Sequence, residues 1–134
     1  MPRPEGRQPI LQGRSRNPGK PIPSKILMEQ TRLDFLQEAL KKNPEDTFAR
    51  YALAMEFSNT GNAESAWGHF EYLLAHHPDY SATYYQAGML LWKQGRREEA
   101  HKVLSQGIEV TRRQGKAHAQ SELEKALEEL ASEI

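Results

Sequence analysis

The chain has 134 residues and no cysteine, which excludes disulfide bonds and thiol chemistry. Its length predicts one domain with a modest core, and its 18 basic and 18 acidic side chains cancel in formal charge. No apolar run approaches the roughly 18 residues that a membrane-spanning helix needs, and the N-terminus lacks the apolar core of a secretory signal, so we expect a cytoplasmic protein without a membrane segment.

Residues 1–23 form a distinct segment that is rich in proline and basic side chains. They contain six of the eight prolines and three of the nine glycines, with few large apolar residues. Glu5 is their only acidic residue. Such a composition cannot form a core, so we predict a disordered basic arm over 1–23 and a helical domain over 24–134.

The first predicted helix covers about 24–43. A proline followed by a capping residue, Pro23 and Ser24, is typical of a helix start. Leu33, Leu36 and Leu40 follow at spacings of three and four, which predicts one apolar stripe, and the helix should end before Pro44.

Two longer segments, about 45–78 and 79–113, match each other at an offset of 34 residues. The match pairs Tyr51 with Tyr85, Met55 with Met89, Gly61 with Gly95, Ala66 with Ala100 and Phe70 with Leu104. Sustained self-similarity of this length indicates a stacked structural repeat. Glycine closes a helix in the left-handed conformation at little steric cost, so each repeat should be a helical hairpin that turns at Gly61 or Gly95.

The residues at fixed places in the two copies resemble the tetratricopeptide repeat family. The first copy carries Leu53, Ala54, Phe57, Ala66, Phe70 and Pro78, and the second carries Tyr84, Ala87, Gly88, Leu91, Ala100 and Leu104. Arg50 departs from the family pattern at a bulky apolar position, and Arg112 departs at the second closing proline. The resemblance implies an all-α fold of about five helices, with hairpins stacked as a short right-handed solenoid, and a non-enzymatic protein-binding scaffold or adaptor.

The last predicted helix, about 116–132, breaks the offset of 34. That offset would place Ser121, Glu122 and Lys125 in the core, whereas an offset of 36 gives Leu123 and Leu127 the inward places of Ala87 and Leu91. We therefore predict a capping helix with a solvated outer face.

A second stripe on the first helix of each repeat is the predicted binding surface. In the resembled family this face lines a concave groove that holds a peptide or helix of a partner protein, and aromatic and methionine side chains are common anchors of such interfaces. The capping helix should add a polar edge of His118, Ser121, Lys125 and Glu128. The predicted groove residues are Phe48, Tyr51, Met55, Ser58, Asn59, Ala82, Tyr85, Met89, Trp92 and Lys93.

Two other uses of the chain remain open at this stage. The same groove could join copies of the chain into a homo-oligomer, or be filled by its own first helix or arm. The basic arm could bind nucleic acid or another anionic surface, although arginines among prolines without interleaved aromatics argue against nucleic acid. Tyr51, Met55, Tyr85 and Met89 stand where family members that bind acidic chaperone tails use lysine, arginine and asparagine, which argues against that role.

The five histidines do not form a recognisable chemical site. No short ligand spacing joins His69, His76, His77, His101 and His118 to carboxylates, and no phosphate-binding loop or nucleophile motif is visible. We therefore predict no catalytic residue, no metal site and no cofactor.

Overall fold

The computed structural model describes residues 23–133, and this part of the chain contains helices and no strands. The all-α class is therefore confirmed. The expected count of about five helices falls one short, because a leading helix, two hairpins and a cap make six; the right-handed stacking stays a prediction. The helices are α2 (Ser24–Lys42), α3 (Thr47–Asn59), α4 (Ala63–His76), α5 (Ala82–Lys93), α6 (Arg97–Arg113) and α7 (Ala117–Ser132).

The chain divides into two compact units after Arg32, inside α2. The amide of Leu27 donates to the carbonyl of Pro23 in the first turn of this helix. Leu36 is the buried residue of α2, whereas Leu33 and Leu40 of the predicted stripe are only half-buried. The second unit, from Leu33 onward, contains helices α3 to α7.

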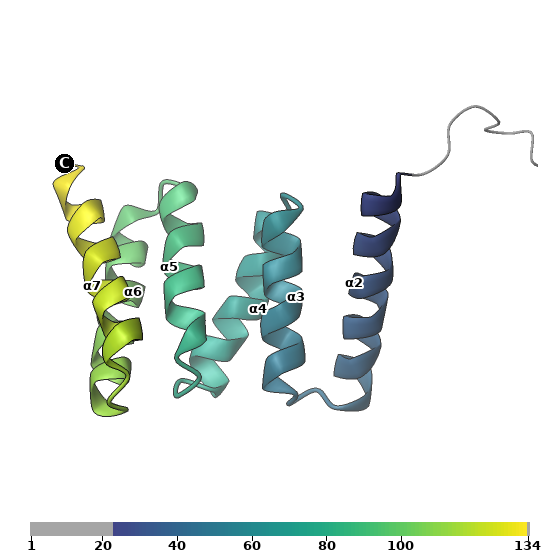
Figure 1. The fold of residues 1–134 in the computed structure, drawn as a ribbon, viewed down its shortest axis with the longest axis horizontal. Coiled ribbons are helices and arrows are strands. Elements are labelled where there is room, and N and C mark those ends of the chain that lie inside the picture. Colours follow the sequence, from purple (N-terminus) through teal and green to yellow (C-terminus); the bar gives the residue numbers. More distant parts are fainter. Residues whose placement is uncertain (1–22, 134) are drawn as a thin grey trace, which may run out of the picture. The chain divides into compact units, whose positions relative to one another are not determined.

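Both predicted hairpins are present, with α3 beside α4 and α5 beside α6 (Figure 1). They turn at Gly61 and Gly95, whose φ angles of 87° and 79° lie in the left-handed region. In each turn the amide after the glycine donates back to a carbonyl near the end of the first helix: Asn62 to Phe57 at 2.8 Å and Arg96 to Leu91 at 2.9 Å. This closure satisfies carbonyls that the helix itself leaves open.

The link between α6 and α7 is a third turn of the same kind. Gly115 has a φ of 70°, and the Lys116 amide donates to the Thr111 carbonyl at 2.9 Å. A closing proline is missing here, and α6 continues to Arg113 before this turn. Helix α6 packs against both α5 and α7.

Small residues are buried where the paired helices pack together. Ala54, Ala66 and Ala100 are fully buried, and Gly88 is buried against Leu104. Larger side chains at these points would separate the helices, because protein interiors are close-packed.

The capping helix follows the offset of 36 residues. Leu123, Ala126 and Leu130 are almost fully buried, whereas Ser121, Glu122 and Lys125 are exposed. Leu127 is only partly buried, although its equivalent Leu91 is fully buried. Among the described helices, α7 packs against α5 and α6, whereas α5 packs against α3, α4, α6 and α7, so α7 is covered by fewer neighbours.

Candidate functional site

The predicted groove surface is formed by the first helices of the repeats and the cap. Within the second unit α5 packs against both α3 and α7, so their matching faces adjoin. Five of the predicted groove residues are partly buried and pack on the core: Tyr51, Met55, Tyr85, Met89 and Trp92. Ser58 is half-buried, and the exposed ones are Phe48, Asn59, Ala82 and Lys93.

A hollow of about 350 Å³ lies where α3, α5 and α7 meet. Three predicted residues line it: Tyr51, Ala82 and Tyr85. The others that line it were not predicted: Ser81, Gln86, Lys116, Ala119, Glu122 and Leu123. The structure thus brings three of the ten predicted residues together around one opening and distributes the rest along α3 and α5.

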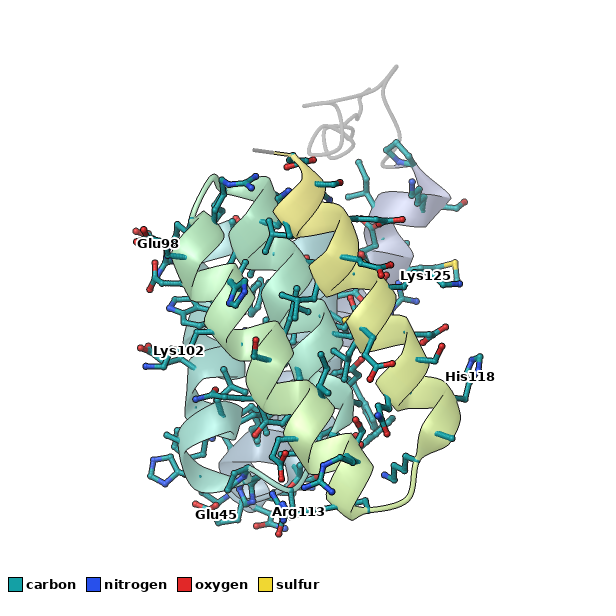
Figure 2. All side chains as sticks on the ribbon, turned by 90° about the vertical axis from the view of Figure 1, so that its left-hand side faces the viewer. Glu45, Glu98, Lys102, Arg113, His118 and Lys125 are labelled. Atoms are coloured by element: carbon teal, nitrogen blue, oxygen red, sulfur yellow. The ribbon has the colours of Figure 1, made fainter. Side chains whose placement is uncertain are left out.

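The polar edge that we expected from α7 is displaced by about one residue. His118 and Lys125 point outward from α7 (Figure 2), and Ser121 and Glu128 are also exposed. The α7 residues at the hollow are Ala119 and Glu122, which lie 37 positions after Ala82 and Tyr85 rather than 36. Successive residues of an α-helix project about 100° apart, so a shift of one residue brings a different face of α7 to the hollow.

The walls of the hollow combine aromatic rings with two opposite charges. The Tyr51 ring meets Phe70 edge-on at 6.3 Å and Tyr80 at 5.6 Å between centroids. Burial raises the pKa of the Tyr51 phenol, so its hydroxyl is protonated at neutral pH and is able to donate. The Lys116 ammonium donates to the Ser81 hydroxyl at 3.1 Å, and the Glu122 carboxylate lies 3.4 Å from His118.

At the other end of the predicted stripe, Trp92 is already bound by the chain itself. Its indole nitrogen donates to a carboxylate oxygen of Glu133 at 2.7 Å, and Arg97 donates to the same oxygen at 2.8 Å. A second Arg97 nitrogen donates to the carbonyl of Leu130 at 2.7 Å. Sequence patterns did not identify Arg97 or Glu133, because these pairings join residues 41 and 36 positions apart.

Arg50, which departs from the family pattern, has a polar role away from the hollow. Its guanidinium lies 3.8 Å above the Tyr72 ring and contacts the His69 ring nitrogen at 3.2 Å. It also donates to the Pro44 carbonyl at 2.9 Å. Burial, together with the charge of Arg50, lowers the pKa of His69, so this histidine is neutral at physiological pH.

A second polar link joins the turn before α3 to the end of α4. The Glu45 carboxylate accepts from the Tyr72 hydroxyl at 2.7 Å and contacts His77 at 2.9 Å. The hydrogen bond from Tyr72 lowers the pKa of Glu45, and the same bond raises the pKa of Tyr72. The contacts of His69 and His77 therefore join neighbouring elements of the fold.

Residues 23–133 contain neither a candidate metal site nor a candidate membrane span. No cluster of three or more histidine, aspartate or glutamate side chains there could hold a metal ion. None of the helices over the same range combines the length and the apolar character that crossing a membrane requires.

Comparison with known proteins defines the class. Residues 60–121 match the tetratricopeptide repeat family. A tetratricopeptide repeat domain protein from Salinibacter ruber, solved in solution, is 42% identical, with a TM-score of 0.63, over 66% of this chain and 89% of that one. A crystal structure of such a protein from the same organism is 41% identical, with a TM-score of 0.63, over 66% of this chain and 98% of that one. None of the curated proteins compared is a significant match.

A more distant likeness extends over a larger part of the chain. The Sgt2 TPR domain from Aspergillus fumigatus is 18% identical, with a TM-score of 0.62, and the match covers 81% of this chain and 74% of that one. At this identity the likeness concerns the fold alone.

Repeated hairpins with small residues at their crossings define a helical-repeat protein, and the chain belongs to the tetratricopeptide repeat family. Domains of this family generally mediate protein–protein interaction and are generally not enzymes.

Proposed function

We propose that the chain is an adaptor that binds a peptide or helix of another protein along the faces of α3, α5 and α7. The observation that carries this proposal is the hollow between Tyr51, Ala82 and Tyr85, which opens at the meeting point of the three helices. Its size and aromatic walls suit a large apolar side chain of the partner as the anchor. Anchors of this kind supply most of the affinity in protein interfaces.

The polar groups at the rim would orient the partner. Lys116 and the Tyr51 hydroxyl offer donors, and Glu122 offers an acceptor on α7. A peptide bound there would place its own polar groups against these residues and its apolar side chain in the hollow. A specific ligand site is usually an apolar cavity with a small number of polar groups around it.

The test fills the hollow without removing a core side chain. Ala82 is exposed at the start of α5 and lines the hollow, so Ala82→Trp should occupy the anchor position in a folded protein. Ala75, an exposed residue of α4 that does not line the hollow, provides the matched control Ala75→Trp. Circular dichroism establishes that both variants fold.

The readout is affinity capture from a native lysate, followed by titration of each purified captured protein. Loss of binding with Ala82→Trp and retention with Ala75→Trp would support the groove as the partner site. Equal binding by both variants would refute it. The apparent molecular mass of the wild-type protein in solution could also rise with its concentration. If Ala82→Trp abolishes this rise and Ala75→Trp does not, the hollow would instead be assigned to self-association. The predicted arm lies outside the described residues apart from Pro23, so its nucleic-acid hypothesis stays a prediction from sequence.

A further inference from the structure

Two hydrogen-bond donors from different helices converge on one carboxylate oxygen beside the groove. The indole nitrogen of Trp92, near the end of α5, lies 2.7 Å from Oε1 of Glu133. Nη1 of Arg97, at the start of α6, lies 2.8 Å from the same atom. Trp92 belongs to the predicted groove stripe, so this oxygen marks the end of the groove away from the hollow.

We propose that Trp92 and Arg97 form a carboxylate-binding site, which Glu133 fills from the same chain until an acidic side chain of the partner replaces it. The inference rests on the proposed function, because it names the chemistry of the partner at one end of the groove. It also gives Glu133 a regulatory role, since its carboxylate competes with the partner for the same two donors.

The donors are held in place by contacts that do not involve Glu133. Nη2 of Arg97 donates to the Leu130 carbonyl at 2.7 Å, which fixes the plane of the guanidinium. The Trp92 ring packs against the hydrophobic core. Neither side chain can accept a hydrogen bond, so both require an acceptor, and a carboxylate adds charge assistance to the bond with arginine. A site that is organised before the ligand arrives loses less entropy on binding.

Glu133 is suited to being displaced. It follows the last residue of α7, and half of its side chain is exposed to solvent. An ion pair with this exposure contributes little to stability, so removing Glu133 leaves the fold intact. A hollow of about 250 Å³ beside Arg97, lined also by Glu98, His101, Leu130 and Ala131, gives another side chain access to Arg97.

The first experiment tests the site in the full chain without any partner. The chain has two tryptophans, and Trp92→Phe assigns their two indole N–H signals in a proton–nitrogen correlation spectrum. Glu133→Ala should move the Trp92 signal and leave the Trp67 signal in place. N-acetylglutamate is then added to Glu133→Ala at constant ionic strength, to on the order of 0.1 M because one exposed ion pair binds weakly.

The expected result is a saturable return of the Trp92 signal toward its wild-type position. N-acetylglutamine amide, which carries no carboxylate, should have little effect, and Arg97→Gln combined with Glu133→Ala should abolish the response. No movement with N-acetylglutamate would overturn the carboxylate site. A Trp92 signal that is the same in wild type and Glu133→Ala would overturn the contact with Glu133.

The second experiment tests displacement with a captured partner. Glu133→Ala should bind that partner more tightly than wild type, by up to about fivefold, because the competing carboxylate is gone. Unchanged affinity would overturn the exchange even if the small acid binds. Ala82→Trp separates the two proposals: it should abolish partner binding, whereas the response of Glu133→Ala, Ala82→Trp to N-acetylglutamate should persist. Failure of the groove proposal would therefore leave the test of the carboxylate site intact.

Discussion

A methyl group placed on Gly88 would come within 2.5 Å of Cδ2 and 2.7 Å of Cγ of Leu104. Gly88 belongs to α5 and Leu104 to α6, so the backbone of one helix lies directly against a side chain of the other. Leu104 is fully buried, so its side chain could move only by displacing packed neighbours. The close packing of α5 against α6 at this point therefore depends on the absence of a single carbon atom.

Gly88→Ala should lower the free energy of unfolding by about 1 to 3 kcal/mol, as overpacking of a well-packed core does. Gly107→Ala should lower it at least as much, because the new methyl group would lie 2.5 Å from Cβ of Tyr84, an atom that cannot move without the backbone. Denaturant unfolding followed by circular dichroism measures both changes.

Gly68→Ala provides the matched control, since nothing lies within 4 Å of a methyl group at this exposed position of α4. Alanine has a higher helix propensity than glycine, so this variant should be more stable by roughly 0.5 to 1 kcal/mol. A Gly88→Ala protein with equal or increased stability would contradict the close approach of α5 and α6.

Thr83 and Thr111 are both fully buried but differ in hydrogen bonding. The Thr83 hydroxyl has no hydrogen-bond partner, whereas the Thr111 hydroxyl donates to the Gly107 carbonyl at 2.8 Å. An unsatisfied buried hydroxyl is costly, so Thr83→Val, which keeps the shape, should raise the free energy of unfolding by about 1 kcal/mol.

Thr111→Val removes a satisfied hydroxyl and should lower the free energy of unfolding by about 1 kcal/mol. Thermal and denaturant unfolding of the pair check both signs under identical conditions. A destabilised Thr83→Val protein would show that this hydroxyl does have an acceptor in solution.

The sequence predicts those parts of the fold that depend on backbone geometry. Gly61 and Gly95 recur at the offset of 34 because a left-handed turn needs glycine, and Ala66 and Ala100 recur because the helices cross there. Gly115 makes the same kind of turn, but the offset of 34 residues does not pair it with another glycine. The positive φ of Gly115 and the hydrogen bond from Lys116 to Thr111 identify this turn in the structure.

The candidate site was less predictable, because it depends on side chains from distant parts of the chain. Tyr51 and Tyr85 were found by their shared helix position, whereas Lys116 reaches the hollow through the turn after α6. The pairing of Trp92 with Glu133 spans 41 positions, and no periodicity joins them. A helix face indicates which residues adjoin along one helix, but not which charge from another helix meets them.

Stability should decrease on mild acidification because of His69. Burial and the neighbouring Arg50 lower its pKa below the usual value of about 6.5, so the folded state favours the neutral ring. The contribution is fully present above pH 6.5 and is lost as the pH falls from there through the folded pKa, because the unfolded chain takes up the proton first. Unfolding free energies between pH 7.5 and 5 measure this slope.

His69→Gln should reduce the loss of stability across this range, and His101→Gln, at an exposed position of α6, controls for removal of a surface histidine. The hydrogen bond from Tyr72 also lowers the pKa of Glu45, but that contribution is lost at lower pH, below the usual glutamate value of about 4.3. The two groups are therefore separated by their pH windows. An unchanged slope in His69→Gln would refute the role of this histidine.

The register of the capping helix can be tested by truncating one core and one surface residue. Leu123 is 2% exposed and takes the place of Ala87 at an offset of 36, so Leu123→Ala should lower the free energy of unfolding by about 2 to 5 kcal/mol. Lys125 would occupy the core at an offset of 34 but points outward from α7. Lys125→Ala should therefore change stability by no more than about 0.5 kcal/mol. Denaturant unfolding decides between the registers, because the reverse order of the two effects would restore the offset of 34 and remove Ala119 and Glu122 from the hollow.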